Sequence, residues 1–332
     1  MRRFFLMISL PGATGAAPSP LFSLSLQAKS RNINTMKKIK STRAFFLNVP
    51  PEGEFAEYRN SLNRRLMLQM FYDENGNLVT DLKYDNHGDL SGKAVYQYDS
   101  KNNRILEETY DADESLEERL TFEYENGRAV RGYVHYLDGS RDEIRFHYTD
   151  AGRLQKKEWV SDEGEIEKTE RFEYEGDHLV LHEITEEEDV VVRQEFMIDD
   201  NGKVLEFTFE NEEEKYKKVH EFDDGGHIIN TLKYDEDDDV VEEETFAYDD
   251  HGNRIFATSE NENGKTEIKM NYLDGKVVSS VELEYNSSGQ VVQQVERDMN
   301  ENGELAELRV FQTGYGKEPL RKYMVVYEYE YF

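Results

Sequence analysis

The 332-residue chain contains no cysteine. This excludes disulfide bonds, thiolate zinc sites, iron–sulfur clusters and a cysteine nucleophile. Long uncharged runs are also missing, because no seventeen consecutive residues after position 50 lack a charge. A membrane-spanning helix needs about 20 predominantly apolar residues. The sequence therefore predicts no transmembrane helix in this part of the chain.

Basic residues are scarce after residue 50, where 282 residues hold 32 Lys or Arg and 71 Asp or Glu. Nucleic-acid phosphates and anionic lipids should repel such a body, so we expect no nucleic-acid partner. A basic protein or a cation is the charged partner that this balance favours. The alternative is that the net charge serves solubility in a sheet-rich protein.

The first fifty residues are different, with eight Lys or Arg and no acidic residue. They resemble a secretory signal or an organelle transit peptide, or residues 1–35 precede a true start at Met36. A start at Met36 predicts a cytoplasmic protein, and a cleaved signal predicts an exported or cell-surface one. In each case we expect residues 1–55 to be a largely disordered extension and residues 56–332 to form a single domain.

A short unit repeats along the chain, as in "YDENGNLVTDLKYDNHGDL" from residue 72 to residue 90. Tyr72 and Tyr84 each begin a Tyr-Asp pair followed by glycine. Alternate copies of this anchor position recur with a period of about 25 residues. They stand at 72, 98, 124, 148, 174, 198, 222, 248, 272 and 299. Each period therefore contains two turns.

The unit predicts a β-hairpin. Apolar and polar residues alternate before each anchor, which is typical of a half-buried strand. Glycine four residues after the anchor fits a type I turn with a left-handed residue. These glycines are at 76, 88, 152, 164, 202, 226, 252, 264, 289 and 303. Asn102 and Asp238 are tolerable replacements, whereas Glu114, Glu188 and Glu213 should give looser hairpins.

Residues 66–311 thus predict an all-β fold, a long antiparallel meander of about twenty short strands. Open sheets rarely exceed about ten strands, so this sheet should coil, close into a shell or form a solenoid-like strip. One face carries an aromatic series, which a sheet curling on itself should cover. The series is Tyr96, Phe122, Phe146, Phe172, Phe196 and Phe246.

The repeat units resemble YD repeats of the RHS type, with MORN-variant-like hairpin repeats as a rival family. The resemblance rests on "FEYENGRAV", "FHYTDAGRL", "FAYDDHGNRI" and "LEYNSSGQVV" and covers residues 72–305. It implies an extended coiled sheet that wraps into a shell, in bacterial surface and toxin proteins. The patterned segment that precedes a toxin tip in that family is not found, so the resemblance does not imply a toxin payload.

No motif for catalysis stands out. The chain has no G-x-S-x-G elbow and no phosphate-cradling loop. His178 and His182 would be about 13 Å apart on a strand, too far to share a metal. Turns such as "YDENGN" suit calcium in part, but ordinary turn chemistry explains them. We therefore expect neither an enzyme nor a bound metal or cofactor.

Acidic residues gather in the second of the two turn series, so one edge of the sheet should form an acidic ridge. The predicted ridge consists of Glu186, Glu187, Glu188, Glu212, Glu213, Glu214, Asp237, Asp238, Asp239, Glu242, Glu243 and Glu244. One hypothesis is a non-enzymatic binding or scaffold protein whose ridge docks a basic protein. The alternative is an exported cell-surface YD-repeat protein that binds carbohydrate or another cell. The simplest explanation is that acidic turns prevent the strands from pairing with neighbouring protein molecules.

Overall fold

The computed structural model describes residues 37–61, 63–313 and 321–332. Its strands belong to one antiparallel sheet, with a short helix α1 (Phe55–Tyr58) beside it. The strands are β1 (Ile39–Val49), β2 (Arg65–Tyr72), β3 (Leu78–Tyr84), β4 (Leu90–Tyr98), β5 (Arg104–Tyr110), β6 (Leu116–Glu125), β7 (Arg128–His135), β8 (Arg141–Tyr148), β9 (Leu154–Val160), β10 (Ile166–Glu175), β11 (His178–Glu186), β12 (Asp189–Ile198), β13 (Val204–Asn211), β14 (Lys215–Phe222), β15 (Ile228–Tyr234), β16 (Val240–Tyr248), β17 (Arg254–Asn261), β18 (Gly264–Leu273), β19 (Lys276–Asn286), β20 (Val291–Met299), β21 (Leu305–Gln312) and β22 (Arg321–Tyr331). The predicted all-β meander is confirmed, since β2 to β21 span nearly the range assigned to it.

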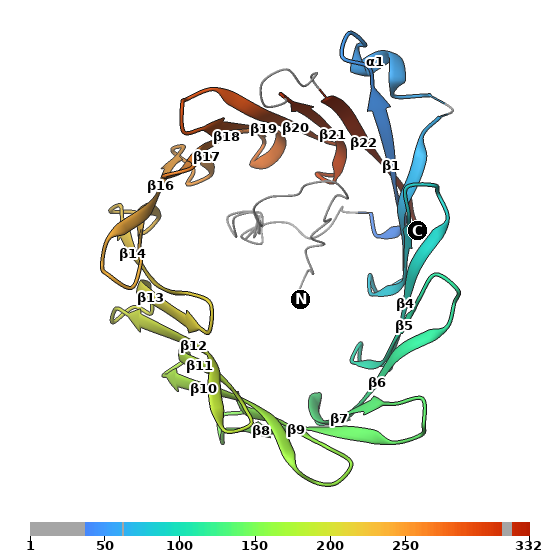
Figure 1. Ribbon diagram of the computed structural model, residues 1–332, viewed down its shortest axis with the longest axis vertical. Helices are drawn as coiled ribbons and strands as arrows, with labels where there is room; N and C mark the ends of the chain where they lie inside the picture. Colours follow the sequence, from blue (N-terminus) through green and yellow to red (C-terminus); the bar gives the residue numbers. More distant parts are fainter. Residues whose placement is uncertain (1–36, 62, 314–320) are drawn as a thin grey trace. The chain divides into compact units, whose positions relative to one another are not determined.

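The sheet closes on itself, as Figure 1 shows for strands β1 to β22. Strand β1 pairs with β2 on one side and with β22 on the other. The direction of the strands explains why β1 is needed to close the sheet. Consecutive strands from β2 to β22 alternate in direction, so β2 and β22 run the same way and cannot form an antiparallel pair. With β1 inserted between them, the antiparallel ladder is continuous through all 22 strands. Of the predicted alternatives, the closed shell is the one observed.

The seam at β1 corrects the prediction that residues 1–55 lie outside the fold. Residues 1–36, with the proposed targeting segment and the start at Met36, lie outside the described residues. Residues 39–49, however, form β1, where Ala44 and Leu47 are 0% and 3% exposed. Ala44 packs with Leu68 of β2 and Val325 of β22. The repeat pattern missed β1 because this strand belongs to no repeat.

The hairpin turns have the predicted geometry. In the turn after β2, the N–H of Gly76 donates to the carbonyl oxygen of Asp73, and the N–H of Asp73 donates to that of Asn77, both at 2.9 Å. The Asp73 carboxylate accepts the N–H groups of Asn75 and Asn77. Gly76 has a φ of 87°. Glycine adopts this left-handed region without strain because it has no Cβ atom.

Two turns differ from the prediction. Glu114 and Glu188 take the left-handed conformation, with φ of 58° and 75°, but Glu213 is not among the positive-φ residues. Gly264 has a φ of 152° and pairs with Asn261 across a two-residue turn. A Cβ atom there would lie 2.0 Å from the carbonyl oxygen of Tyr285. This glycine therefore serves the close approach of β19. The looser hairpins expected at Glu114 and Glu188 stay a prediction.

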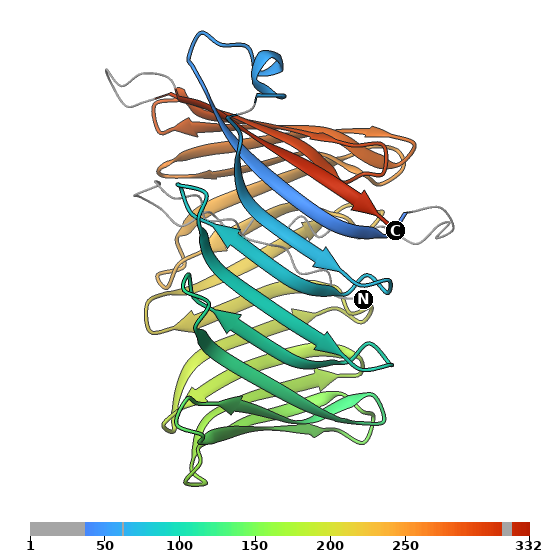
Figure 2. The same cartoon turned by 90° about the vertical axis from the view of Figure 1, so that its right-hand side faces the viewer.

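The sheet has distinct outer and inner faces. Helix α1 lies outside the ring of strands (Figures 1 and 2), and its Phe55 packs against Phe311 with ring centroids 5.0 Å apart. Phe311 therefore projects from the outer face. Residues paired across neighbouring strands share a face, so the register extends this assignment round the sheet. The predicted aromatic series, from Tyr96 to Phe246, lies on the inner face.

The inner aromatic rings are covered from the side rather than by an opposite wall. Side chains fill a closed sheet of about eight strands, and this sheet is far wider. The substantial contacts between strands all join hydrogen-bonded neighbours. Arg104 lies over Phe122 at 5.5 Å, and Arg254 lies over Phe246 at 5.5 Å. Cations thus lie over four of the six rings that we expected a curled sheet to cover, which are Tyr96, Phe122, Phe172 and Phe246.

Candidate functional site

Alternate turns of the closed meander lie at opposite ends of the strands and form two rims, seen at the two sides of Figure 2. We call the turns after the even-numbered strands β2 to β20 the first rim. We call the turns after the odd-numbered strands β3 to β19 the second rim. The two rims differ in packing and in charge, and this difference defines the candidate site.

Tyrosine hydroxyl groups join neighbouring strands along the first rim. Tyr248, the last residue of β16, donates its hydroxyl to the carbonyl oxygen of Ile228, the first residue of β15, at 2.8 Å. The same bond recurs in the pairs Tyr98–Leu78, Tyr124–Arg104, Tyr148–Ala129, Tyr174–Leu154 and Tyr272–Arg254. Burial raises the pKa of the Tyr248 hydroxyl, which keeps it a donor. Each such bond stabilises the rim by about 0.5–1.5 kcal/mol.

Side chains of the first rim also pack onto the next turn. His227 stacks on Tyr248 with ring centroids 4.7 Å apart and lies against Gly252, where a Cβ atom would meet its ring at 2.9 Å. Arg128, His178 and Lys203 take the same place over the next glycine of this rim, at 152, 202 and 226. These four turns of the first rim are therefore packed against their neighbours, whereas the first-rim glycines at 76, 127, 176, 275 and 303 have no such contact.

The second rim shows no such packing at its left-handed glycines. Those at 88, 139, 164 and 289 have no atom within 4 Å of the position that a Cβ would take, as also holds for five glycines of the first rim. Loops held apart on a rigid scaffold are the usual location of binding residues, so the second rim is the candidate interaction surface.

Four consecutive turns of the second rim contain no Lys or Arg. They are residues 161–165, 186–189, 212–214 and 235–239, which follow β9, β11, β13 and β15. We call these four turns the acidic rim segment. Each contains at least three carboxylates. The first rim opposite them carries basic side chains such as Arg153 and Lys203.

Strand lysines neutralise only part of this charge. Lys217 contacts Asp238 at 3.0 Å, and Lys168 contacts Glu186 at 2.9 Å. Lys233 lies 3.9 Å from Glu214. Within the described part of the chain, eleven exposed carboxylates of the segment make no ion pair: Asp162, Glu163, Glu165, Glu187, Glu188, Asp189, Glu212, Glu213, Glu236, Asp237 and Asp239.

The structure places nine of the twelve predicted ridge residues together. Glu186 to Glu188, Glu212 to Glu214 and Asp237 to Asp239 are exposed in three neighbouring turns of the second rim. Residues 242–244 lie within strand β16 instead. Glu244 is 6% exposed and pairs with Lys218 on the inner face. Glu242 accepts a hydrogen bond from Ser259. Because side chains alternate along a strand, Glu243 lies on the face of β16 opposite to Glu242 and Glu244. Their adjacency in the sequence had suggested a single cluster.

Exposed aliphatic side chains accompany the acidic turns, and sequence reasoning missed them. Ile166, Val190 and Val240 are 54%, 52% and 53% exposed. Each lies directly after an acidic turn, at or next to the start of its strand. Val241 beside them is also exposed. The available signal was an aliphatic residue directly following an acidic turn, as in "DEGEI" and "EEEDV".

The histidines singled out in the sequence have structural contacts. His178 lies against the turn glycine Gly202. His182 donates a hydrogen bond from Nδ1 to the amide oxygen of Gln194 at 3.0 Å and stacks on Phe172. Trp159 lies beneath Lys157 and Lys168 on the inner face. Over residues 37–61, 63–313 and 321–332, no group of three His, Asp or Glu is arranged to hold a metal ion.

Comparison with known proteins gives likeness of fold alone. No family model matches the chain, and no curated protein matches it. The crystal structure of TcdB2-TccC3 superposes with a TM-score of 0.39 at 11% identity, over 82% of this chain and 18% of the other. The Photorhabdus luminescens Tc holotoxin pore gives 0.32 at 8% identity, over 87% of this chain and 19% of the other. This chain thus spans under a fifth of either toxin chain.

A structure of similar length is the porin-like protein from Bacteroides uniformis. Its TM-score is 0.30 at 10% identity, over 89% of this chain and 98% of the other. Among the described residues of the present chain, no helix has the length and apolar character to span a membrane.

Proposed function

We propose that this chain is a non-enzymatic binding scaffold of YD-like hairpin repeats, and that its acidic rim segment docks a basic protein. One observation carries the proposal. Four consecutive turns on the second rim present carboxylates with no Lys or Arg among them, while the opposite rim is mixed in charge and packed at several of its turns. Charge of one sign arranged on one surface steers a partner of the opposite sign.

The spacing of these turns sets the size of the partner surface. Neighbouring strands lie about 4.8 Å apart, so successive turns of one rim are about 10 Å apart. The four turns therefore extend along roughly 30 Å. A basic surface or an extended basic segment of this length would contact all four turns together.

The aliphatic residues narrow the kind of partner. Ile166, Val190 and Val240 stand beside acidic turns and are about half exposed. Exposed apolar residues rimmed by polar ones mark protein interaction sites. The partner surface should therefore combine Lys or Arg with apolar side chains, which separates it from a uniformly basic polymer.

The first rim supports this arrangement mechanically. Its tyrosine bonds and stacked side chains join several neighbouring hairpins to one another. The hairpin ends on the opposite rim are thereby held at a fixed spacing. A preorganised surface loses less conformational entropy on binding.

The carbohydrate alternative has less support in the geometry. It calls for exposed aromatic rings along a groove. In the described part of the chain, the exposed aromatic side chains are Tyr136 and Phe332. The inner rings, such as Phe122 and Phe246, lie under cations. The repeat-family assignment itself rests on the Tyr-Asp turns and the period of about 25 residues.

A matched pair of charge variants tests the proposal. The rim variant combines Glu187→Gln, Glu213→Gln and Asp237→Asn. The control combines Asp200→Asn, Asp224→Asn and Asp250→Asn, which are exposed acidic residues of the first rim. Each variant removes the same charge. Proteins from the native source are captured on wild type and on both variants, at low and high salt.

We expect a basic protein to be retained by the wild type and the control and released by the rim variant. A further variant, Ile166→Ser with Val240→Ser, preserves the charge and should also weaken capture. Equal capture by the rim variant and the control would overturn the proposal, because net charge alone would then explain retention.

A further inference from the structure

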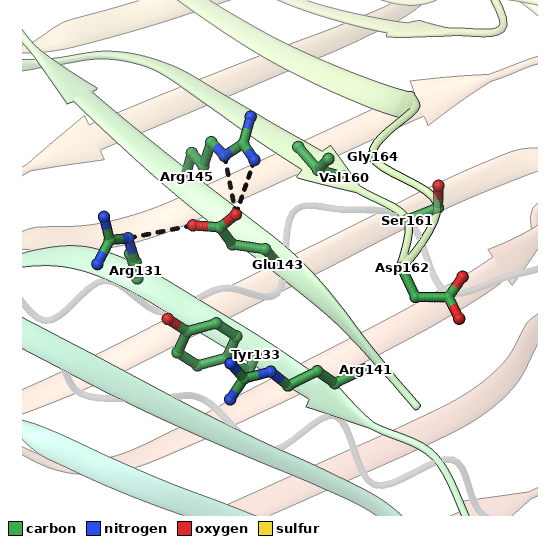
Figure 3. Close-up of a pocket in the computed structure, with 9 residues that line it drawn as sticks. All are labelled: Arg131, Tyr133, Arg141, Glu143, Arg145, Val160, Ser161, Asp162 and Gly164. Atoms are coloured by element: carbon green, nitrogen blue, oxygen red, sulfur yellow. Dashed lines mark hydrogen bonds and ion pairs between the residues drawn. The ribbon is translucent and has the colours of Figure 1, made fainter. Parts of the chain in front are cut away.

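A small hollow on the outer face gathers three arginines in an otherwise acidic chain. It has a volume of about 300 Å³ and lies between β7, β8 and the turn after β9. Figure 3 shows its charged and aromatic side chains on adjacent strands. The residues that matter here are Arg131, Tyr133, Arg141, Glu143, Arg145 and Asp162.

Two of the arginines are held by one carboxylate. Arg145 donates to Glu143 through its Nε and Nη2 atoms at 2.9 and 2.8 Å. The Nε atom of Arg131 lies 3.1 Å from the other oxygen of Glu143. Glu143 therefore fixes both guanidinium groups, and it is neutralised by them (Figure 3).

The third arginine is different. Arg141 lies over the ring of Tyr133, with its guanidinium carbon 4.1 Å from the ring centroid. It has no carboxylate partner among the residues that the structure describes. A guanidinium stacked on an aromatic ring is preorganised and still presents its planar edge of N–H donors. A carboxylate matches this edge with two parallel hydrogen bonds.

The charge around the hollow favours a ligand with a single negative charge. Arg131 also lies 3.7 Å from Glu123. Glu123, Glu143 and Asp162 therefore balance the three arginines. Arg141 alone has no carboxylate partner within the described residues, and one carboxylate suits it better than a dianion. An apolar surface adjoins the hollow, because Ile166 pairs with its buried residue Val160 and is 54% exposed.

We infer that this hollow binds a carboxylate attached to an apolar group, with Arg141 as the main recognition residue. An acidic side chain flanked by apolar residues in a peptide has this chemistry, and so does a small apolar organic acid. The hollow adjoins the acidic rim segment, with which it shares the turn 161–165 and the neighbouring Ile166, but it uses arginines of the outer face and a ligand of opposite charge.

The test uses a dye-labelled peptide Leu-Glu-Leu with blocked ends, its Leu-Gln-Leu counterpart, and glutarate as a competitor. Binding to the full chain is followed by fluorescence anisotropy. A charge-assisted hydrogen bond is worth about 1.5 kcal/mol or more, so the Glu peptide should bind at least about tenfold more tightly than the Gln peptide. Competition by glutarate at equal concentration would identify a small-acid source, and its failure a peptide source.

Arg141→Gln should remove the tenfold preference, and Arg141→Lys should reduce it because the planar fork is lost. Arg193→Gln is the matched control, since Arg193 is an outer-face arginine already paired with Glu183 and Glu195. Unchanged melting temperatures show that the variants fold. Equal binding of the two peptides, or an unaltered preference in Arg141→Gln, would overturn the inference.

Discussion

Lys203 lies over the ring of Phe222 at 5.1 Å, at the place where other hairpins of the first rim combine a stacked side chain with a tyrosine hydroxyl bond. Arg153 lies over Tyr174 in the same way, and there the hydroxyl also reaches the carbonyl oxygen of Leu154. The contact at Phe222 therefore preserves the stacking and lacks the hydrogen bond. The first rim is consequently weaker between β13 and β14.

Phe222→Tyr should restore the missing bond. The equivalent acceptor is the carbonyl oxygen of Val204, the first residue of β13. We expect the free energy of unfolding to rise by about 0.5–1.5 kcal/mol, measured by urea denaturation. Tyr248→Phe should lower it by a similar amount. Tyr234→Phe on the second rim, whose hydroxyl makes no hydrogen bond within the described residues, should change it little.

Gly252→Ala and Gly164→Ala should differ in cost although both positions are left-handed, with φ of 77° and 90°. The conformational cost for an L-residue, about 1–2 kcal/mol, is common to both. At Gly252 the new methyl group also meets the His227 ring, which is held between Asp223 and Tyr248.

Gly252→Ala should therefore lower the free energy of unfolding more than Gly164→Ala, by about 1 kcal/mol or more, as overpacking typically does. Thermal and urea denaturation of both variants measure this. Equal destabilisation would show that neighbouring turns of the first rim do not pack as described.

Acid should lower the stability of turns that begin with an aspartate, such as Asp249, because it protonates that carboxylate. The side-chain amide of Asn253, with the backbone N–H groups of Asn253 and His251, lowers the pKa of Asp249. A pKa depressed below the unfolded value, about 3.9, contributes stability above that value. This contribution disappears as the pH falls through the folded pKa.

Asp249→Asn preserves an acceptor oxygen and removes the charge. The wild type should therefore be more stable than Asp249→Asn at neutral pH, and the difference should vanish in strong acid. Urea midpoints of both proteins from about pH 7 to pH 2 follow this. A difference that grows on acidification would contradict the role given to Asp249.

Strand β1 should be required for closure. Thr42 is 4% exposed and pairs with Met70 of β2 and Tyr329 of β22. Thr42→Pro removes a ladder donor from a central strand, and β2 and β22 cannot pair antiparallel without β1. We expect open strand edges and self-association, which light scattering would detect as a higher mass. Thr42→Val retains the backbone donor and should keep the wild-type mass. A Thr42→Pro protein that keeps the wild-type mass and melting temperature would contradict this.

The repeat made most of the fold predictable from sequence. Tyr72, Asp73 and Gly76 each have a local role in one hairpin, so their recurrence gave the strands and the turn geometry. Closure was less accessible, because β1 carries no Tyr-Asp-Gly signal. Its partners lie 19 or more residues away in β2 and at the far end of the chain in β22. Pairing across such separations leaves no periodic trace.

The candidate site was predictable in part for the same reason. Alternation of turns assigned Glu187, Glu213 and Asp237 to one edge, and they lie in the second rim. It also suggested Glu244, which strand alternation turns to the inner face beside Lys218. The exposure of Ile166 depends on the absence of a covering element, which composition does not reveal.

Carboxyl labelling of the wild-type chain, with and without the basic protein that it retains, tests the central claim most directly. Carbodiimide coupling followed by peptide mass spectrometry reports each exposed acidic residue separately. We predict protection of Glu187, Glu213 and Asp237 in the complex, with Asp200 and Asp250 of the first rim labelled as before. Equal protection of both rims, or protection of the first rim alone, would contradict the claim that the second rim is the docking surface.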